Sequence, residues 1–186
     1  MHYREYQNSR DLAWEILIRE NVASLPVMVG QLCHRIGIRV RYFRPEGRSD
    51  GYCTIVGGQP VIFVSDVCSV ERQRFTAAHE LGHILLGHVG KYQLVNREPD
   101  PEDNPIEQAA NVFASRLLAP AVILWALDAR TPEEIGALCK ISHQAAAFRA
   151  ERMAILFQRN KFLASPLERQ VYAQFTDFIA GKRAGD

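Results

Sequence analysis

The sequence predicts an α+β fold that is mostly helical and contains one small antiparallel sheet of three strands. Three short extended runs, at residues 38–43, 52–56 and 60–65, are separated by segments rich in proline and glycine. Most of the remaining chain carries apolar residues at helical spacing. With 186 residues, 47% of them hydrophobic and 23% charged, the composition is that of a globular protein that can bury a full core.

Local signals predict the elements of the N-terminal third. We expect one helix over about residues 9–23 and a second that has Pro26 in its first turn and ends near Gly37. Two glycines at positions 57 and 58 join the last two extended runs closely enough for a hairpin. Five arginines lie between positions 35 and 48 with one acidic residue, which is typical either of a nucleic-acid patch or of a solvated strand face. Their alternation with apolar residues favours the solvated face.

The chain becomes helical after the third extended run. Ser69 has the chemistry of an N-cap for a helix that reaches about Gly87. A polar connector with three prolines follows, and the next helix covers about residues 106–119, where a proline stops it. A pair of short helices comes next, capped by Thr131 and Ser142. The final helix is expected over about residues 167–180, with a glycine after it as a stop signal.

Charge and cysteine content limit the function classes. The 22 basic and 21 acidic residues leave a net charge of +1, so no overall field draws the protein to nucleic acid or to an anionic membrane. The four cysteines, at positions 33, 53, 68 and 139, have no C-x-x-C spacing, which indicates free thiols in a reducing compartment. We see no stretch of signal-peptide type and no uncharged apolar run of 18 residues. We therefore expect a cytoplasmic protein without a membrane segment.

The pentapeptide His79-Glu80-Leu81-Gly82-His83 carries the strongest chemical signal. Two histidines four apart on a helix project from the same face, so both imidazoles can reach one metal ion. Glu80 lies about 100° around the helix from His79, where it can act as a general base without being a ligand. The glycine between the histidines lets another backbone approach closely. The alternative is a helix that happens to bury two histidines.

A catalytic zinc usually takes three protein ligands, so a third donor is expected. Glu107 lies where the next helix turns apolar, and a carboxylate there is costly to bury unless it is paired or bound to metal. Its alternative role is the acidic half of a capping box that begins at Asn104. Glu102 and Asp103 are weaker ligand candidates, because the proline-rich connector surrounds them.

Two further polar residues accompany these candidates. Asn111 lies four residues after Glu107 and shares its face, so its amide oxygen is expected near the ring N–H of a ligand histidine. His88 lies five residues beyond His83, which should turn it away from the ligand face, and it is interpreted as a residue at the end of the helix.

In this arrangement the chain resembles the ImmA/IrrE family of bacterial and phage metallopeptidases. The resemblance covers about residues 25–153 and rests on four blocks, Arg74-Phe75-Thr76, His79-Glu80-Leu81-Gly82-His83, Glu107-Gln108-Ala109-Ala110-Asn111-Val112-Phe113-Ala114 and Leu117-Leu118-Ala119-Pro120. It implies a minimal zincin-like (gluzincin-like) peptidase over residues 1–122, followed by a helical, helix-turn-helix-like region over residues 123–186 packed on it.

The resemblance also implies a function. One Zn²⁺ per chain would be held by His79, His83 and Glu107, and Glu80 would be the catalytic residue of a zinc metallo-endopeptidase. Family members typically cleave helix-turn-helix repressors and so switch on stress or mobile-element genes. From the residues themselves, we expect Glu80 to take a proton from the attacking water. We expect the strand at residues 61–65 to present an edge along which an extended substrate pairs. No oligomeric state is predicted.

The competing hypothesis is a DNA-binding or metal-sensing regulator whose peptidase-like domain does not catalyse. The predicted helix pair after position 130 resembles a helix-turn-helix. Its basic residues, Lys140, Arg149 and Arg152, are balanced by nearby glutamates, so direct binding of nucleic acid is not expected. A third option is a general peptidase that degrades many unfolded proteins.

Overall fold

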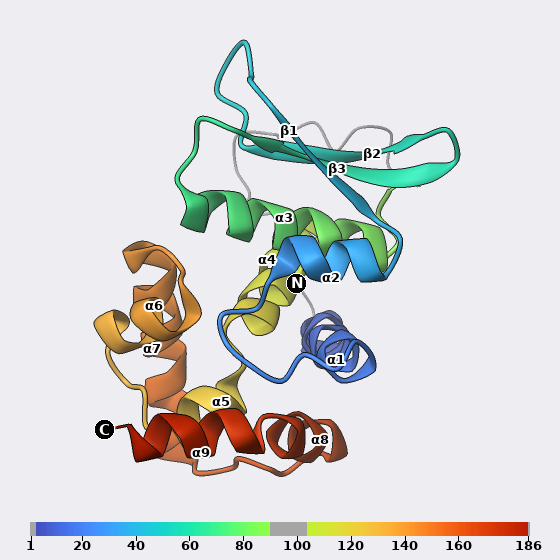
Figure 1. The fold of residues 1–186 in the computed structure, drawn as a ribbon. Coiled ribbons are helices and arrows are strands. Elements are labelled where there is room, and N and C mark those ends of the chain that lie inside the picture. The colour runs from blue at the N-terminus through green and yellow to red at the C-terminus, as the bar shows by residue number, and fades with distance from the viewer. Residues whose placement is uncertain (1–2, 90–103, 186) are drawn as a thin grey trace. The chain divides into compact units, whose positions relative to one another are not determined.

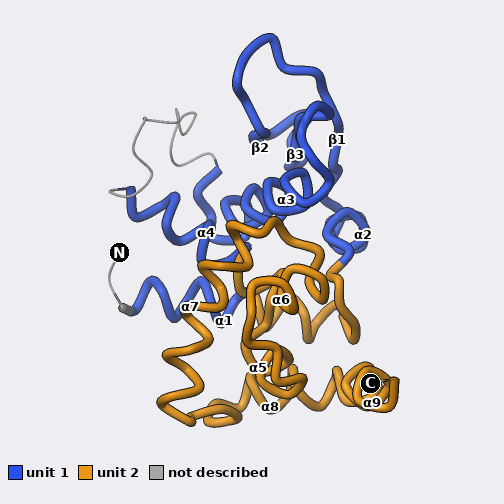
Figure 2. Tube along the Cα trace, turned by 90° about the vertical axis from the view of Figure 1, so that its left-hand side faces the viewer, with its two compact units in different colours: residues 1–12, 28–114 blue, residues 13–27, 115–186 orange. Residues whose placement is uncertain are grey.

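The computed structural model describes residues 3–89 and 104–185 and confirms a mostly helical α+β fold (Figure 1). In chain order the elements are α1 (Tyr3–Arg19), α2 (Val29–Arg35), β1 (Arg39–Phe43), β2 (Gly51–Val56), β3 (Gln59–Ser65), α3 (Val70–Leu85), α4 (Pro105–Leu118), α5 (Ala121–Ala126), α6 (Pro132–Cys139), α7 (His143–Arg159), α8 (Pro166–Gln174) and α9 (Thr176–Ala184). Two compact units divide the chain: residues 1–12 with 28–114, and residues 13–27 with 115–186 (Figure 2).

The three-stranded sheet of the first unit has the order β1-β3-β2. β2 and β3 form the predicted antiparallel hairpin, in which Tyr52 lies opposite Phe63, and both hairpin glycines have positive φ angles of 59° and 77°. β1 pairs parallel to β3, so the sheet is mixed. The prediction of a wholly antiparallel sheet is wrong on this point. The prediction that residues 61–65 form an edge is also wrong, because β3 has a partner on each side, and Val61, Ile62 and Val64 are buried. β2 is the edge strand of the hairpin.

The two faces of the sheet have different environments. One face packs on α3, where a Cβ atom added to Gly51 would lie 2.5 Å from Cγ2 of Thr76 (Figure 1). On the other face three rings cluster, with Tyr52 stacked on Phe63 at 4.9 Å between centroids and Phe43 edge-on to Tyr52 at 5.5 Å. The five arginines of residues 35–48 are exposed, as expected of a solvated face.

The second unit consists of helices. The predicted pair after position 130 is present as α6 and α7, and the side chain of Ser142 accepts a hydrogen bond from the backbone N–H of Ala145 at the start of α7. The predicted final helix is instead two helices, α8 and α9, that meet at Phe175. The Thr176 hydroxyl donates to the carbonyls of Tyr172 and Ala173, and such back-bonding bends a helix.

Arg149 of α7 is buried in this unit. Its side chain is 2% exposed, and its Nε and Nη2 atoms donate to the carbonyl of Ala119 at 2.9 and 2.6 Å. Ala119 directly follows α4, so the positive charge of Arg149 lies at a helix C-terminus. The helix dipole is negative there and stabilises a cation. The guanidinium of Arg149 therefore stabilises the fold and is not presented at the surface.

The helical stretch Pro105–Ala126 is long and apolar enough to cross a membrane by length and composition. However, 78% of its most apolar window is buried inside the protein, as in the core helix of a globular domain. No membrane segment is indicated by this stretch.

Candidate metal centre

Two helices of the first unit carry the candidate site. Ser69 is the N-cap of α3, as predicted, and its side chain accepts a hydrogen bond from the backbone N–H of Arg72. The two histidines of the pentapeptide lie in the last two turns of α3. At Gly82, between them, α4 approaches closely: a Cβ atom there would lie 3.0 Å from Cδ1 of Phe113 and 3.3 Å from Cα of Ala110. This close approach brings the first turns of α4 against the histidines.

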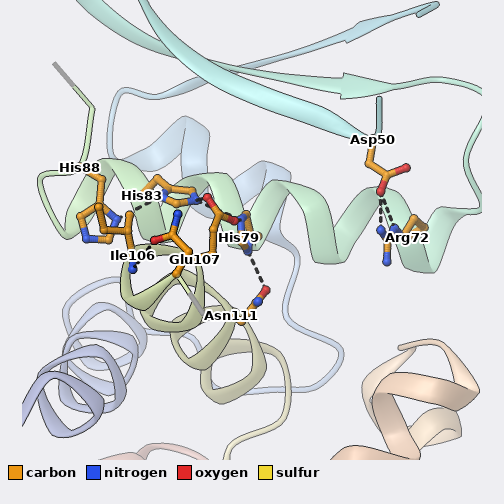
Figure 3. Close-up of polar contacts among 9 residues, drawn as sticks. Asp50, Arg72, His79, His83, His88, Ile106, Glu107 and Asn111 are labelled. Atoms are coloured by element: carbon orange, nitrogen blue, oxygen red, sulfur yellow. Dashed lines mark hydrogen bonds and ion pairs between the residues drawn. The ribbon is translucent and has the colours of Figure 1, made fainter. Parts of the chain in front are cut away.

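His79, His83 and Glu107 converge at this contact (Figure 3). The Nε2 atoms of the two histidines are 3.0 Å apart, and the Glu107 carboxylate lies 3.1 Å from Nε2 of His79 and 3.3 Å from Nε2 of His83. Zinc–ligand bonds of about 2.0–2.1 Å in a tetrahedron place neighbouring ligand atoms about 3.3 Å apart. The three donor atoms therefore stand at the spacing that one small cation requires.

The hydrogen bonds behind the histidines select their tautomers. Oδ1 of Asn111 lies 2.9 Å from Nδ1 of His79, and because a carbonyl oxygen only accepts, Nδ1 carries the proton and donates it. The lone pair of His79 is thus on Nε2, which faces Glu107. Asn111 occupies the position beside a histidine N–H that was expected from its spacing. A hydrogen bond of this kind holds the ring of a metal ligand in place.

His88 lies against the second histidine, contrary to expectation. Its Nδ1 atom is 3.0 Å from Nδ1 of His83, and the two ring centroids are 5.2 Å apart. The prediction was wrong because α3 ends at Leu85, and Gly87 adopts a positive φ of 73° that turns the chain back. The glycine was the signal that could have revealed this contact. When Nδ1–H of His83 donates to His88, the lone pair of His83 is also on Nε2.

The alternative role of Glu107 is only half present. The Asn104 side chain does cap α4, since its Oδ1 accepts a hydrogen bond from the backbone N–H of Ile106 at 3.0 Å. The Glu107 oxygens are directed at His79 and His83 instead of back to Asn104. When the Nε2 atoms of the two histidines carry protons instead of a metal ion, their hydrogen bonds hold the pKa of Glu107 well below its ordinary value, although partial burial opposes this shift. Glu102 and Asp103, the weaker candidates, lie outside the described residues.

Glu80 stands apart from the three converging residues. It is 6% exposed and faces the sheet side of α3, where the Cys53 thiol of β2 is its partner. This position agrees with the expected rotation of about 100° from His79. Sequence reasoning did not single out Cys53, because a cysteine in a strand carries no signal of its own.

The chemistry of the site fits a divalent metal ion. Two ring nitrogens whose lone pairs face each other at 3.0 Å repel unless a proton or a cation lies between them. The adjacent carboxylate is held in its charged form, which is the form that binds metal. Imidazole nitrogens and carboxylate oxygens are the ligands of catalytic zinc sites, although they also bind iron, cobalt and nickel.

A family model matches more than half of the chain, and two further comparisons give similar proteins. The family described as the IrrE N-terminal-like domain, Peptidase M78, matches residues 33–151. The radiation response metalloprotease IrrE of Deinococcus deserti is 34% identical over 108 residues, which are 55% of this chain and 37% of that protein. The chain thus spans little more than a third of that relative's length. A solved structure of a Mycobacterium tuberculosis transcriptional regulator matches 76% of this chain and 48% of its own, with a TM-score of 0.49 and 16% identity.

Proposed function

The chain belongs to the Peptidase M78 family of IrrE N-terminal-like domains, and on this basis we propose that it is a zinc-dependent endopeptidase that cleaves a helix-turn-helix repressor. The observation that carries the peptidase proposal is the convergence of two histidine Nε2 atoms and one carboxylate at ligand spacing, beside a buried glutamate that is not a ligand. A cytoplasmic location fits the four free cysteines.

In the proposed mechanism, His79, His83 and Glu107 hold the metal, and Asn111 and His88 orient the two rings. When bound, the metal polarises the scissile carbonyl and lowers the pKa of the attacking water. Glu80 accepts the proton of that water on its carboxylate and later donates it to the nitrogen of the leaving amine. The sheet contributes β2, an edge strand among the described residues, along which an extended substrate segment can pair through its backbone.

The proposed substrate class rests on the family and on charge. The relative from Deinococcus deserti is described as a radiation response metalloprotease, which suggests a regulatory role and not bulk protein turnover. The net charge of +1 and the burial of Arg149 leave no concentrated basic surface on α7 for direct binding of DNA. We propose that the protein cleaves a DNA-binding repressor and does not bind DNA itself.

Glu80→Gln tests the chemistry of the site. The amide keeps the shape of the side chain but cannot accept a proton, so the variant should keep its metal and fall by at least about 100-fold in peptide cleavage. Elemental analysis checks the metal content, and His83→Ala is the matched variant that should lose metal and activity together. Cleavage by Glu80→Gln at the wild-type rate, with metal bound, would contradict the mechanism.

The substrate class needs a second experiment. A candidate helix-turn-helix repressor from the same genome and unfolded casein are incubated separately with the enzyme, and the products are mapped by mass. One dominant cut in the repressor is expected, with casein largely intact. Rapid, scattered cleavage of casein would favour a general peptidase. Binding of operator DNA at physiological salt, unchanged by a chelator, would favour the regulator hypothesis.

A further inference from the structure

Strand β2 follows α3 through three successive contacts. The Asp50 carboxylate, just before β2, forms an ion pair with Arg72 in the first turn of α3 (Figure 3). One turn further along the helix, Gly51 allows β2 to approach Thr76. These contacts set which face of β2 looks at the helix.

The register of β2 then determines what faces the next helical turn. Side chains two apart on a strand point to the same side, and residues four apart on a helix share a face. Cys53 therefore follows Gly51 on the helix side of β2, and Glu80 follows Thr76 on the sheet side of α3. The pairing of Cys53 with the buried Ile62 of β3 agrees with this orientation.

The side chains of Cys53 and Glu80 meet at this third contact. The thiol is half-buried, and burial, the negative charge of Glu80 and a hydrogen bond between the two side chains raise the pKa of Cys53 well above its ordinary value. The thiol is therefore protonated at neutral pH, and its S–H donates to the Glu80 carboxylate. A carboxylate that is 6% exposed needs such a partner, since an uncompensated buried charge is costly.

We propose that Cys53 is a positioning residue that holds the Glu80 carboxylate in the orientation required for proton transfer. This inference rests on the proposed peptidase function. The Cys53 thiol engages Glu80 from the sheet side of α3, about 100° around the helix from His79. Because β2 is an edge strand of the described three-stranded sheet, the strand that would pair with the substrate also carries the residue that fixes the base.

The contact itself is tested without any catalysis. Metal-free wild-type protein and Glu80→Gln are treated with iodoacetamide at pH 8, and the modification of each cysteine is followed by peptide mass mapping. Removal of the negative charge should lower the pKa of Cys53 and speed its alkylation, by about tenfold for each unit that the pKa falls. Cys68 is the internal control, because its partner at 3.5 Å is Asp50 and not Glu80. The proposal would be overturned if Glu80→Gln sped the alkylation of both cysteines equally, or sped the alkylation of neither.

The positioning role is tested by steady-state kinetics on whichever protein the wild type cleaves. Cys53→Ala should lower kcat by about tenfold, the order that a hydrogen bond to a charged group contributes, and leave KM and metal content unchanged. Cys53→Ser, which keeps a donor, should restore most of the loss, and Cys68→Ala should have no effect. The inference would be overturned if Cys53→Ala kept the wild-type kcat. It would also be overturned if the Co²⁺-loaded wild type showed a thiolate charge-transfer band that Cys53→Ala abolishes, because Cys53 would then be a metal ligand. In both cases the peptidase function stands. A wild type that cleaves neither substrate overturns the proposed function itself.

Discussion

Gly82→Ala tests whether the close approach of α3 and α4 sets the geometry of the metal centre. The new Cβ atom would lie 3.0 Å from Cδ1 of Phe113 and 3.3 Å from Cα of Ala110. An ordinary carbon–carbon contact is about 3.5 Å, so the shortfalls are about 0.5 Å at the ring and about 0.2 Å at the backbone. The ring of Phe113 can rotate, but relief at Ala110 requires a shift of α4 itself. Glu107 lies one turn before Ala110 and moves with it.

The structure gives the expected magnitudes. Alanine is about 1 kcal/mol better than glycine inside a helix, whereas overpacking of a core costs about 1–3 kcal/mol. The metal-free variant should therefore be destabilised by up to about 2 kcal/mol, or about 8 °C in Tm for a chain of this size. Metal–ligand distances hold to within about 0.2 Å, so the expected shift of α4 reaches the limit that a bound metal allows. Metal affinity should therefore fall by about tenfold, at the lower end of what changes around a site cost.

Chelator competition measures the metal affinity, and thermal unfolding of the metal-free protein measures the stability. Gly181→Ala is the matched control, because Gly181 lies within α9 and, outside its own stretch of helix, its added Cβ meets no atom of the described residues within 4 Å. This control should gain stability and keep its metal affinity. If Gly82→Ala gains the same stability and binds metal as tightly as the wild type, the close approach does not set the site.

Two further predictions concern the residues around the histidines. Asn111→Ala should weaken metal binding by about 10–100-fold in chelator competition, because Asn111 orients His79 without being a ligand. The metal content at saturation should stay at one per chain. Loss of the metal even at saturation would show that Asn111 is a ligand. Glu107 has a lowered pKa in the folded protein, so it contributes stability above about pH 4.3, its ordinary pKa, and loses that contribution as the pH falls. Urea unfolding of the metal-free protein should therefore show a stability gap between wild type and Glu107→Gln at pH 7 that closes below pH 4, and a gap independent of pH would contradict this assignment.

The elements that sequence predicted best are those with signals inside a few residues. The cap at Ser69, the hairpin at Gly57-Gly58 and the start of α7 after Ser142 all depend on local chemistry. The parallel pairing of β1 with β3 was missed because strand order depends on contacts between distant residues. The division into domains at residue 122 stays a prediction.

The candidate site shows the same limit at a finer scale. The spacing of His79, Glu80 and His83 along one helix indicated a ligand pair with a separate acid, and a carboxylate on an apolar helix face indicated Glu107. Helical extrapolation misplaced His88, because it assumed that α3 continues through Gly87. Cys53 could not be found at all, since its position depends on the register of β2 against a helix that follows it in the chain. The roles of these residues stay predictions until the variants are made.

The burial of Arg149 changes how genetic data on this protein should be interpreted. A scan that removes the positive charges of α6 and α7, in search of a nucleic-acid surface, would include this residue beside the exposed Lys140. Arg149→Ala leaves the Ala119 carbonyl without its donors, and an unsatisfied buried acceptor costs about 1–3 kcal/mol. A loss of that size can change the cellular amount of a protein several-fold. A regulatory defect in Arg149→Ala would therefore report how much folded protein remains, whereas Lys140→Ala would report on surface charge.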